Sequence, residues 1–132
     1  MGASSYPITG RSVAGNTVVE LAGGTAQWRA DLTSSMGGSG KDPDPHDLLD
    51  SALVACTILT LQLYAKRKNY PLEGVEVSLT HDESGGTYRM NRKVAVSGAL
   101  DEQQRADLLR VANACPIHKA LSRKFEITTE LA

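Results

Sequence analysis

The sequence predicts an α+β domain with the element order ββαββααβ, and three features of the chain lead to that prediction. Residues 45–68 form a long apolar segment with helix signals at both ends. Residues 74–80 and 87–98 alternate hydrophobic and polar side chains on either side of a two-glycine turn, as a β-hairpin does. A capping pattern at residue 101 then opens a second helical region. Strands and helices that follow in runs, rather than in strict alternation, are typical of α+β folds.

Length and charge narrow the classes of protein further. A chain of 132 residues with 41% hydrophobic and 22% charged residues can bury one sizeable core, so we expect a single domain over residues 1–132. The 14 basic and 15 acidic residues are interspersed, which argues against nucleic acid or an anionic membrane surface as a partner. The longest uncharged stretch, residues 51–65, is shorter than the ~20 residues of a membrane-spanning helix. No basic and then apolar signal segment opens the chain, so we expect a cytoplasmic protein.

The first third of the chain predicts one hairpin and two irregular segments. Residues 1–16 are polar and contain Gly and Ser, so we expect a loosely ordered start. Residues 17–21 and 25–32 predict a first hairpin, with its turn at residues 22–24. Residues 33–45 gather Ser, Gly and Pro and predict a loop.

The segment 45–68 carries the strongest local signals in the chain. Asp44 can cap a helix, Pro45 suits its first position, and Asp47 places a negative charge in its first turn. Three basic residues, 66–68, complement the helix dipole at the other end. We therefore expect one helix from Pro45 to about residue 68.

The middle of this helix is apolar on almost every side, which indicates that other elements cover most of its faces. We expect it to be the buried spine of the fold, packed on antiparallel sheets. One Trp and one Phe serve the whole core, and two hairpins with two short helices provide too little cover. The sequence therefore predicts a homodimer in which a second copy covers the helix.

The C-terminal half predicts two short helices. Asp101 and Gln104 form a capping box before a helix that extends to about residue 113. The residue before a proline is pushed out of helical geometry, whereas proline itself favours the first helical position. A third helix should therefore begin at Pro116, with Cys115 at its N-cap.

Two segments of the C-terminal half predict strands. Along residues 74–80 and 87–98 the apolar side chains occupy alternate positions, with the turn at residues 85–86. Residues 125–131 alternate in the same manner, which predicts a closing strand.

The two cysteines, Cys56 and Cys115, lack a Cys-x-x-Cys partner, which argues against a zinc cluster and a multi-bridge secreted scaffold. In a reducing compartment they could be inert buried thiols, a transient redox pair, or one nucleophile and one bystander. Cys56 has leucines and alanines at helical spacing around it, so it is inert unless another segment brings a donor to it. Cys115 at a helix N-cap faces backbone N–H groups and the positive end of the dipole.

His118 lies one turn beyond Cys115 and could with it supply two metal ligands. Only His46 and His81 remain to complete such a shell, so we expect no metal and interpret His118 as a helix surface residue.

Two motifs are similar to those of the OsmC/Ohr family, the osmotically inducible and organic hydroperoxide resistance proteins. The first is the helix segment, Asp44-Pro45-His46-Asp47-Leu48-Leu49 followed by Ala52-Leu53-Val54-Ala55-Cys56-Thr57. The second is Ala112-Asn113-Ala114-Cys115-Pro116-Ile117-His118-Lys119-Ala120-Leu121. The resemblance covers about residues 37–131, and the two motifs stand in the family's order and separation.

The resemblance implies a thiol peroxidase in which Cys56 attacks an organic hydroperoxide and Cys115 resolves the sulfenic acid as a disulfide, which a dithiol then reduces. It also implies an OsmC-like fold, an intertwined homodimer with sites at the subunit interface, and no cofactor. Leucines beside Cys56 would suit an alkyl hydroperoxide better than hydrogen peroxide.

The chain departs from the peroxidase pattern at one carboxylate and one arginine. His46 stands where those members carry a glutamate, and the nearest carboxylate, Asp47, is turned by about 100° on a helix. Arg11, with Arg29 behind it, is the nearest candidate for the arginine. Helix-end charge for Asp47 and a surface position for Arg11 are the alternatives, and the chain looks closer to the general OsmC-like branch.

A second function on the same scaffold stays open. The chain could be a non-catalytic protein that binds or senses a small molecule or an acyl chain in an apolar interface cleft. The missing pair of carboxylate and arginine favours this alternative, whereas the retention of both cysteines in their motifs favours the peroxidase.

Overall fold

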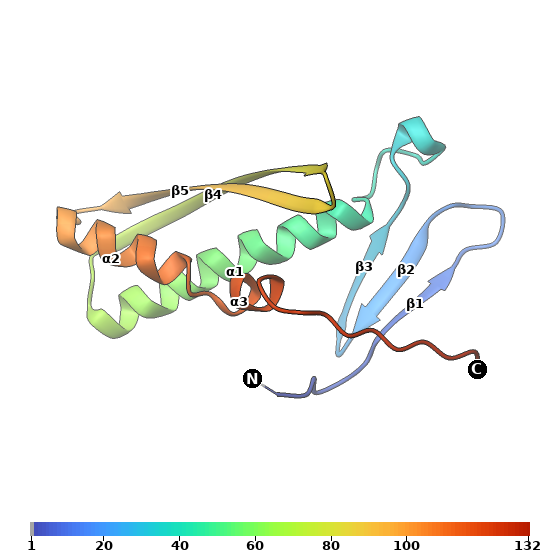
Figure 1. Ribbon diagram of the computed structural model, residues 1–132, viewed down its shortest axis with the longest axis horizontal. Coiled ribbons are helices and arrows are strands. Elements are labelled where there is room, and N and C mark those ends of the chain that lie inside the picture. The colour runs from blue at the N-terminus through green and yellow to red at the C-terminus, as the bar shows by residue number, and fades with distance from the viewer. Residues whose placement is uncertain (1) are drawn as a thin grey trace. The chain divides into compact units, whose positions relative to one another are not determined.

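The computed structural model describes residues 2–132, and it divides into two compact units, one ending at Leu49 and one comprising Asp50–Ala132. The division falls inside the long helix, and each unit is described by itself. The elements in chain order are β1 (Ile8–Ser12), β2 (Val19–Gly23), β3 (Ala26–Ala30), the short 3-10 helix η1 (Ser34–Met36), α1 (Pro45–Lys68), β4 (Leu72–Ser84), β5 (Thr87–Gly98), α2 (Glu102–Ala112) and α3 (Pro116–Leu121) (Figure 1).

The first unit contains an antiparallel sheet in the order β1-β2-β3. Strands β2 and β3 confirm the first hairpin, although its turn is Gly24-Thr25 rather than residues 22–24. Gly24 adopts a φ of 58°, a value that favours glycine. The prediction of a loosely ordered start is wrong for β1, which pairs along β2 from Ile8 to Ser12. Every residue of β1 is exposed, so hydrophobic alternation gave no signal for this strand.

The loop after β3 is organised around the buried carboxylate of Asp31. This carboxylate accepts hydrogen bonds from the Thr17 hydroxyl, from the backbone N–H of Leu32, and from the N–H and hydroxyl of Ser39. These donors, led by the Ser39 N–H, lower the pKa of Asp31 to about 2. The predicted loop therefore has a fixed course, with η1 as its one helical turn.

Helix α1 has the predicted boundaries. The Asp47 N–H donates to the Asp44 carboxylate at 2.8 Å, and the Asp44 N–H donates to the Asp47 carboxylate at 3.1 Å, so the two residues cap the helix reciprocally. By length and composition alone α1 could also cross a membrane, a criterion that the core helices of water-soluble proteins also meet. Its buried residues form one stripe at four-residue spacing, Leu53, Thr57, Leu61 and Ala65.

The expectation that α1 is covered on most of its faces is wrong for the single chain. Leu59 is 64% exposed and Leu63 is 49% exposed, and both lie away from the buried stripe. The described chain therefore covers one face of this helix and leaves part of its apolar surface open.

Strands β4 and β5 form the second hairpin, which is antiparallel from Leu72–Gly98 to Ser84–Thr87. Gly85 and Gly86 both have positive φ, which two-residue turns that match the twist of the strands require. Intermediate and exposed residues alternate as predicted along β5 and from Val75 to Thr80 of β4, whereas the rest of β4 up to Ser84 is exposed. One face of the hairpin therefore packs against helices while the other faces outward.

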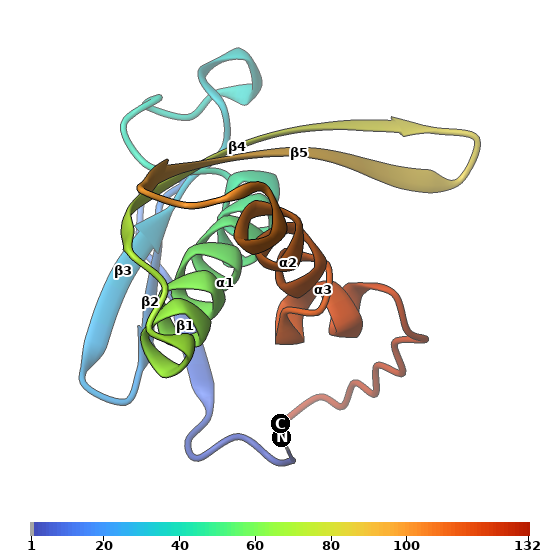
Figure 2. The same cartoon turned by 90° about the vertical axis from the view of Figure 1, so that its left-hand side faces the viewer.

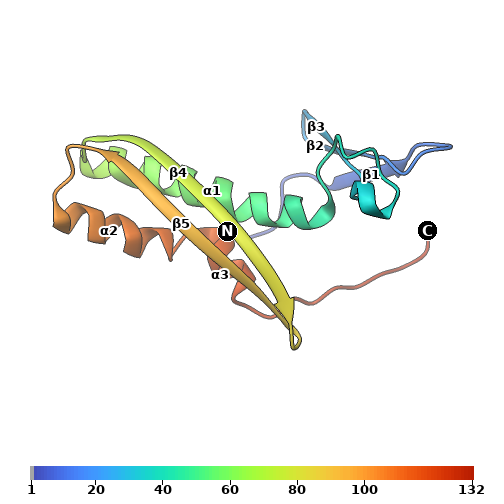
Figure 3. The same ribbon diagram turned by 90° about the horizontal axis from the view of Figure 1, so that it is seen from above.

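The core of the second unit lies between this hairpin and two helices. Figures 2 and 3 show α1 and α2 on the same side of the β4–β5 hairpin. The fully packed cluster comprises Leu61 and Ala65 of α1 with Leu108, Val111 and Ala112 of α2, and Val75, Val94 and Val96 pack against it. The predicted capping box of α2 is present, with Asp101 and Gln104 each bonded to the other's backbone N–H.

A carboxylate ties α2 to α1 at one end of this core. The hydroxyls of Tyr64 and Tyr70 each donate to Asp107 at 2.7 Å, and Arg110 pairs with the same carboxylate at 2.6 Å. The hydrogen bonds from the tyrosines and Arg110 hold the pKa of Asp107 well below its usual range. The hydrogen bond from Tyr70 to Asp107, with burial as a second cause, raises the pKa of Tyr70 to about 12.

The predicted closing strand is wrong. Residues 124–132 have no regular structure and are exposed along their whole length. The alternation is present, but in the described chain no strand offers these residues a partner for their backbone N–H and C=O groups.

We expect Leu61→Ala to lower the free energy of unfolding by about 2–5 kcal/mol, because the Leu61 side chain is completely buried and its loss leaves a cavity. Gln62→Ala, at the exposed neighbouring position, should change it by less than about 0.5 kcal/mol. Urea unfolding followed by circular dichroism measures both values. Equal effects of the two substitutions would contradict the described core.

We also expect the first unit to lose structure in acid between about pH 4 and pH 2. The pKa of Asp31 is lower in the folded state than in the unfolded chain, so its charge stabilises the fold above about pH 4, and this contribution disappears as the pH falls. The only tryptophan of the chain, Trp28 in β3, reports this change by fluorescence. Asp31→Asn should weaken the pH dependence, whereas Asp82→Asn, at an exposed position, should preserve it.

Candidate functional site

The two cysteines occupy different environments in the second unit, and both are free thiols. Cys56 lies in the middle of α1 and is partly exposed. Cys115 is the N-cap of α3, as predicted, and is completely buried. A reagent from solution therefore has access to Cys56 rather than to Cys115.

Helix α3 brings the two sulfurs together. The N–H of Ile117 donates to Cys56 Sγ at 3.5 Å, and the N–H of the next residue, His118, donates to Cys115 Sγ at 3.3 Å. The Thr60 hydroxyl lies 3.8 Å from Cys56 Sγ and adds a further polar contact. Two consecutive amides at the start of α3 thus donate to one sulfur each.

An arginine that the sequence analysis missed lies beside the buried sulfur. Arg92 of β5 points its guanidinium at Cys115, with Nη1 4.0 Å from Cys115 Sγ. Its position was available from the strand pattern, because residue 92 has the same parity as the inward-facing Val94 and Val96. A charged residue on the inward face of a half-buried strand is unusual and is the signal that could have identified it.

Three neutral hydrogen-bond acceptors surround the Arg92 guanidinium in addition to the Cys115 sulfur. Nη1 donates to the Thr57 hydroxyl at 2.8 Å, and Nη2 donates to Asn113 Oδ1 at 3.1 Å and to His118 Nδ1 at 2.9 Å. The Thr57 hydroxyl in turn donates to the Leu53 carbonyl at 2.7 Å, which fixes its orientation. Within residues 2–132 no carboxylate pairs with this guanidinium.

His118 is not the surface residue that the sequence analysis expected. It is half-buried, and its Nδ1 accepts the hydrogen bond from Arg92, which leaves the proton of the neutral ring on Nε2. Burial, and then the charge of Arg92, lower the pKa of His118 below its ordinary value. In the described part of the chain no three His, Cys, Asp or Glu side chains gather as metal ligands.

A shallow cleft of about 410 Å³ opens next to the Arg92 guanidinium, on the side of β5 and α3. Its lining combines apolar and neutral polar side chains with one positive charge: Leu53, Tyr88, Met90, Asn91, Arg92, Asn113, His118, Leu121 and Ser122. The lining contains no acidic residue.

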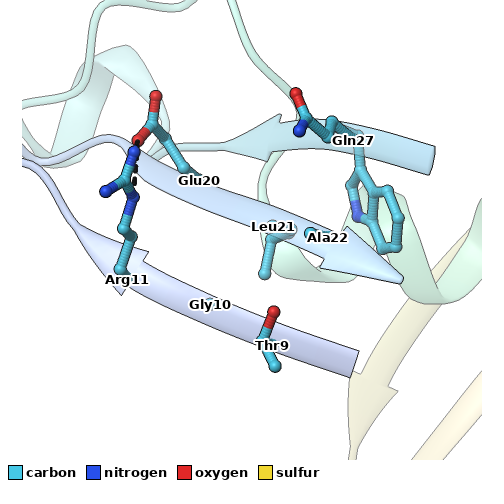
Figure 4. Close-up of a pocket in the computed structure, with 8 residues that line it drawn as sticks. Thr9, Gly10, Arg11, Glu20, Leu21, Ala22 and Gln27 are labelled. Carbon is cyan, nitrogen blue, oxygen red and sulfur yellow. Dashed lines mark hydrogen bonds and ion pairs between the residues drawn. The ribbon is translucent and has the colours of Figure 1, made fainter. Parts of the chain in front are cut away.

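The two auxiliary candidates, Arg11 and Asp47, have local partners in the first unit. Arg11 of β1 pairs with Glu20 of the neighbouring strand β2 at 2.8 Å, and Figure 4 shows the two side chains joined. Asp47 is engaged in the cap with Asp44. Their contribution to the thiol site stays a prediction.

The comparisons with known proteins agree with this architecture. A family model described as OsmC-like protein matches residues 38–130. A search of the curated proteins found no match.

Solved structures match over most of the chain. An OsmC-like protein from Mycoplasma pneumoniae is 20% identical, with a TM-score of 0.76 over 90% of this chain and 88% of its own. A putative organic hydroperoxide resistance protein from Vibrio cholerae, with captopril bound in one of its active sites, is 25% identical, with a TM-score of 0.62 over 90% of this chain and 86% of its own. The organic hydroperoxide resistance protein OhrB of Bacillus subtilis is 23% identical, with a TM-score of 0.56 over 89% of this chain and 90% of its own. The matched family model, the shared fold and the resemblance of both cysteine motifs lead to one conclusion: the chain belongs to the OsmC-like protein family.

Proposed function

We propose that this protein is a thiol peroxidase that reduces organic hydroperoxides with Cys56 and Cys115. The observation that carries the proposal is the pair of consecutive amides that hold one sulfur each at the start of α3. A redox pair needs two thiols that can reach each other, and it needs groups that favour their thiolates. The organic hydroperoxide resistance protein of Vibrio cholerae, which is similar over most of the chain, supports the same chemistry.

Access decides which sulfur attacks. Cys56 is partly exposed, whereas Cys115 is completely buried, so the hydroperoxide meets Cys56 first. The Cys56 thiolate attacks the terminal oxygen of the hydroperoxide, the O–O bond breaks, and the alkoxide leaves with a proton as an alcohol. Cys56 is then a sulfenic acid, which a second thiol must convert before it is oxidised further.

Cys115 supplies the second thiol. Its thiolate attacks the sulfur of the sulfenic acid, a disulfide forms, and the hydroxide leaves as water after it takes a proton. A small dithiol then reduces the disulfide and becomes a disulfide itself, which returns both cysteines to thiols. The cycle uses no cofactor, and it belongs in a reducing compartment such as the cytoplasm.

Leucines near Cys56 favour an organic substrate. Leu53 and Leu59 lie one turn before and after Cys56 on α1, and Leu59 is largely exposed. Such a surface contacts an alkyl or aryl group better than it contacts water. We therefore expect cumene hydroperoxide to be consumed faster than hydrogen peroxide.

The two thiols should differ in single-turnover stoichiometry. Cys56→Ser should abolish hydroperoxide consumption, because a hydroxyl cannot replace a thiolate in attack on oxygen. Cys115→Ser should consume about one equivalent per chain and then stop, with Cys56 as sulfenic or sulfinic acid. Peroxide assays with intact-mass analysis distinguish these states.

In the unaltered protein one equivalent of hydroperoxide should produce a Cys56–Cys115 disulfide within the chain, and peptide mapping detects it. Two free thiols after this treatment would reject the peroxidase and favour the alternative of a non-catalytic binding protein. A burst in Cys56→Ser with none in Cys115→Ser would reverse the assignment of roles.

We also propose that the protein is a homodimer in which a second copy covers the open face of α1. Leu63→Lys should shift the protein toward a monomer in sedimentation velocity, because a buried ammonium at this face costs far more than a leucine. Leu109→Lys changes another exposed leucine, on α2, and serves as the control. A folded monomer at micromolar concentration in the unaltered protein would contradict this proposal.

A further inference from the structure

We propose that Arg92 holds Cys115 as a thiolate and thereby sets the rate of the resolving step, while it leaves the attack by Cys56 unaffected. This inference rests on the proposed function, because it assigns a residue to one of its two steps. Neither cysteine motif contains Arg92, which lies on the β4–β5 hairpin.

The first argument is that the charge of Arg92 is uncompensated. A partly buried guanidinium ordinarily pairs with a carboxylate, since removal of a charge from water is costly without one. Here the hydroxyl of Thr57, the amide oxygen of Asn113 and the ring nitrogen of His118 accept its hydrogen bonds, and all three are neutral. The one group in contact with Arg92 that can become an anion is the sulfur of Cys115.

The second argument is that the guanidinium is held in place by the neighbours of both cysteines. Thr57 follows Cys56 directly in α1, while Asn113 and His118 lie on either side of Cys115. The planar fork of arginine suits several acceptors in fixed directions. A neutral His118 is part of this arrangement, because a protonated ring could not accept the Arg92 hydrogen bond.

The third argument concerns selectivity between the two sulfurs. Cys115 Sγ has Arg92 Nη1 at 4.0 Å together with the His118 N–H. Cys56 Sγ has the Ile117 N–H as a donor and the Thr60 hydroxyl as a further contact, and both groups are neutral. A full positive charge thus faces the sulfur that resolves, while the sulfur that attacks has dipoles alone.

The chemistry of the resolving step explains why a charge is useful there. A thiol attacks a sulfenic acid only as a thiolate, and a completely buried sulfur has no water to stabilise that anion. The guanidinium provides this stabilisation until the S–S bond forms, the S–O bond of the sulfenic acid breaks, and the sulfur of Cys115 becomes neutral. Fast resolution then protects Cys56 from further oxidation.

The test separates the two steps in Arg92→Met and Arg92→Lys. Rapid mixing with one equivalent of cumene hydroperoxide measures peroxide consumption as the first step and disulfide formation as the second, with dimedone to trap sulfenic acid. We expect Arg92→Met to slow disulfide formation by about tenfold to a hundredfold and to accumulate trapped sulfenic acid, with the first step unchanged. Arg92→Lys should restore part of the rate, which a purely structural role would not predict.

Arg89→Met is the matched control. Arg89 lies on the same strand, is exposed and binds Ser84, so its loss should change neither step. A slower first step in Arg92→Met, an equal loss in both steps, or no change in either would each overturn the inference.

A second measurement does not depend on peroxidase activity. In Cys56→Ser the ultraviolet absorbance of the thiolate reports Cys115 alone, and we expect a thiolate signal at neutral pH that Arg92→Met removes and Arg92→Lys partly retains. The absence of a thiolate signal in Cys56→Ser would overturn the inference even if the protein is a peroxidase. A signal that persists when Cys56→Ser and Arg92→Met are combined would overturn it as well. Conversely, the expected absorbance with no peroxide consumption would refute the proposed function and leave the effect of Arg92 on Cys115 established.

Discussion

The junction between Cys115 and Pro116 is the constraint on which the thiol site depends. Proline cannot continue α2, and it pushes the preceding residue into the extended conformation that Cys115 adopts, with φ −66° and ψ 150°. The same proline starts α3, so the first free amides of a new helix appear immediately after the cysteine. The second cysteine then reaches this helix start from α1, and the two sulfurs share one source of N–H donors.

Local signals determined the helices, and for that reason the sequence predicted them well. The boundaries of α1, the capping box of α2 and the start of α3 at Pro116 depend on residues that are neighbours in the chain. The second hairpin was equally accessible, because its glycine turn and its alternation are local. The contact of Ile117 with Cys56 was not, since it depends on how α1 and α3 pack.

The errors arose where a segment depends on a partner. β1 is paired along β2 although it is exposed throughout, so it lacks the alternation that identifies a strand. The segment 125–131 has the alternation but no strand beside it in the described chain. Arg92 was not predicted because the family resemblance places the cation in the N-terminal region, whereas the alternation of β5 places residue 92 on its inward face. His118 was wrongly predicted to be a surface residue because its partner, Arg92, lies 26 positions away in the chain.

The link between Asp107 and Tyr64 has a mechanical consequence for the sulfurs. Tyr64 lies eight positions after Cys56, and Asp107 lies eight positions before Cys115, so the link joins the antiparallel helices α1 and α2 at the end remote from the thiols. Hydrogen bonds at one end and the α3 amides at the other oppose any sliding of one helix along the other. The distance between the two sulfurs therefore depends on the Tyr64–Asp107 hydrogen bond at the far end of the helices as well as on the α3 amides beside the sulfurs.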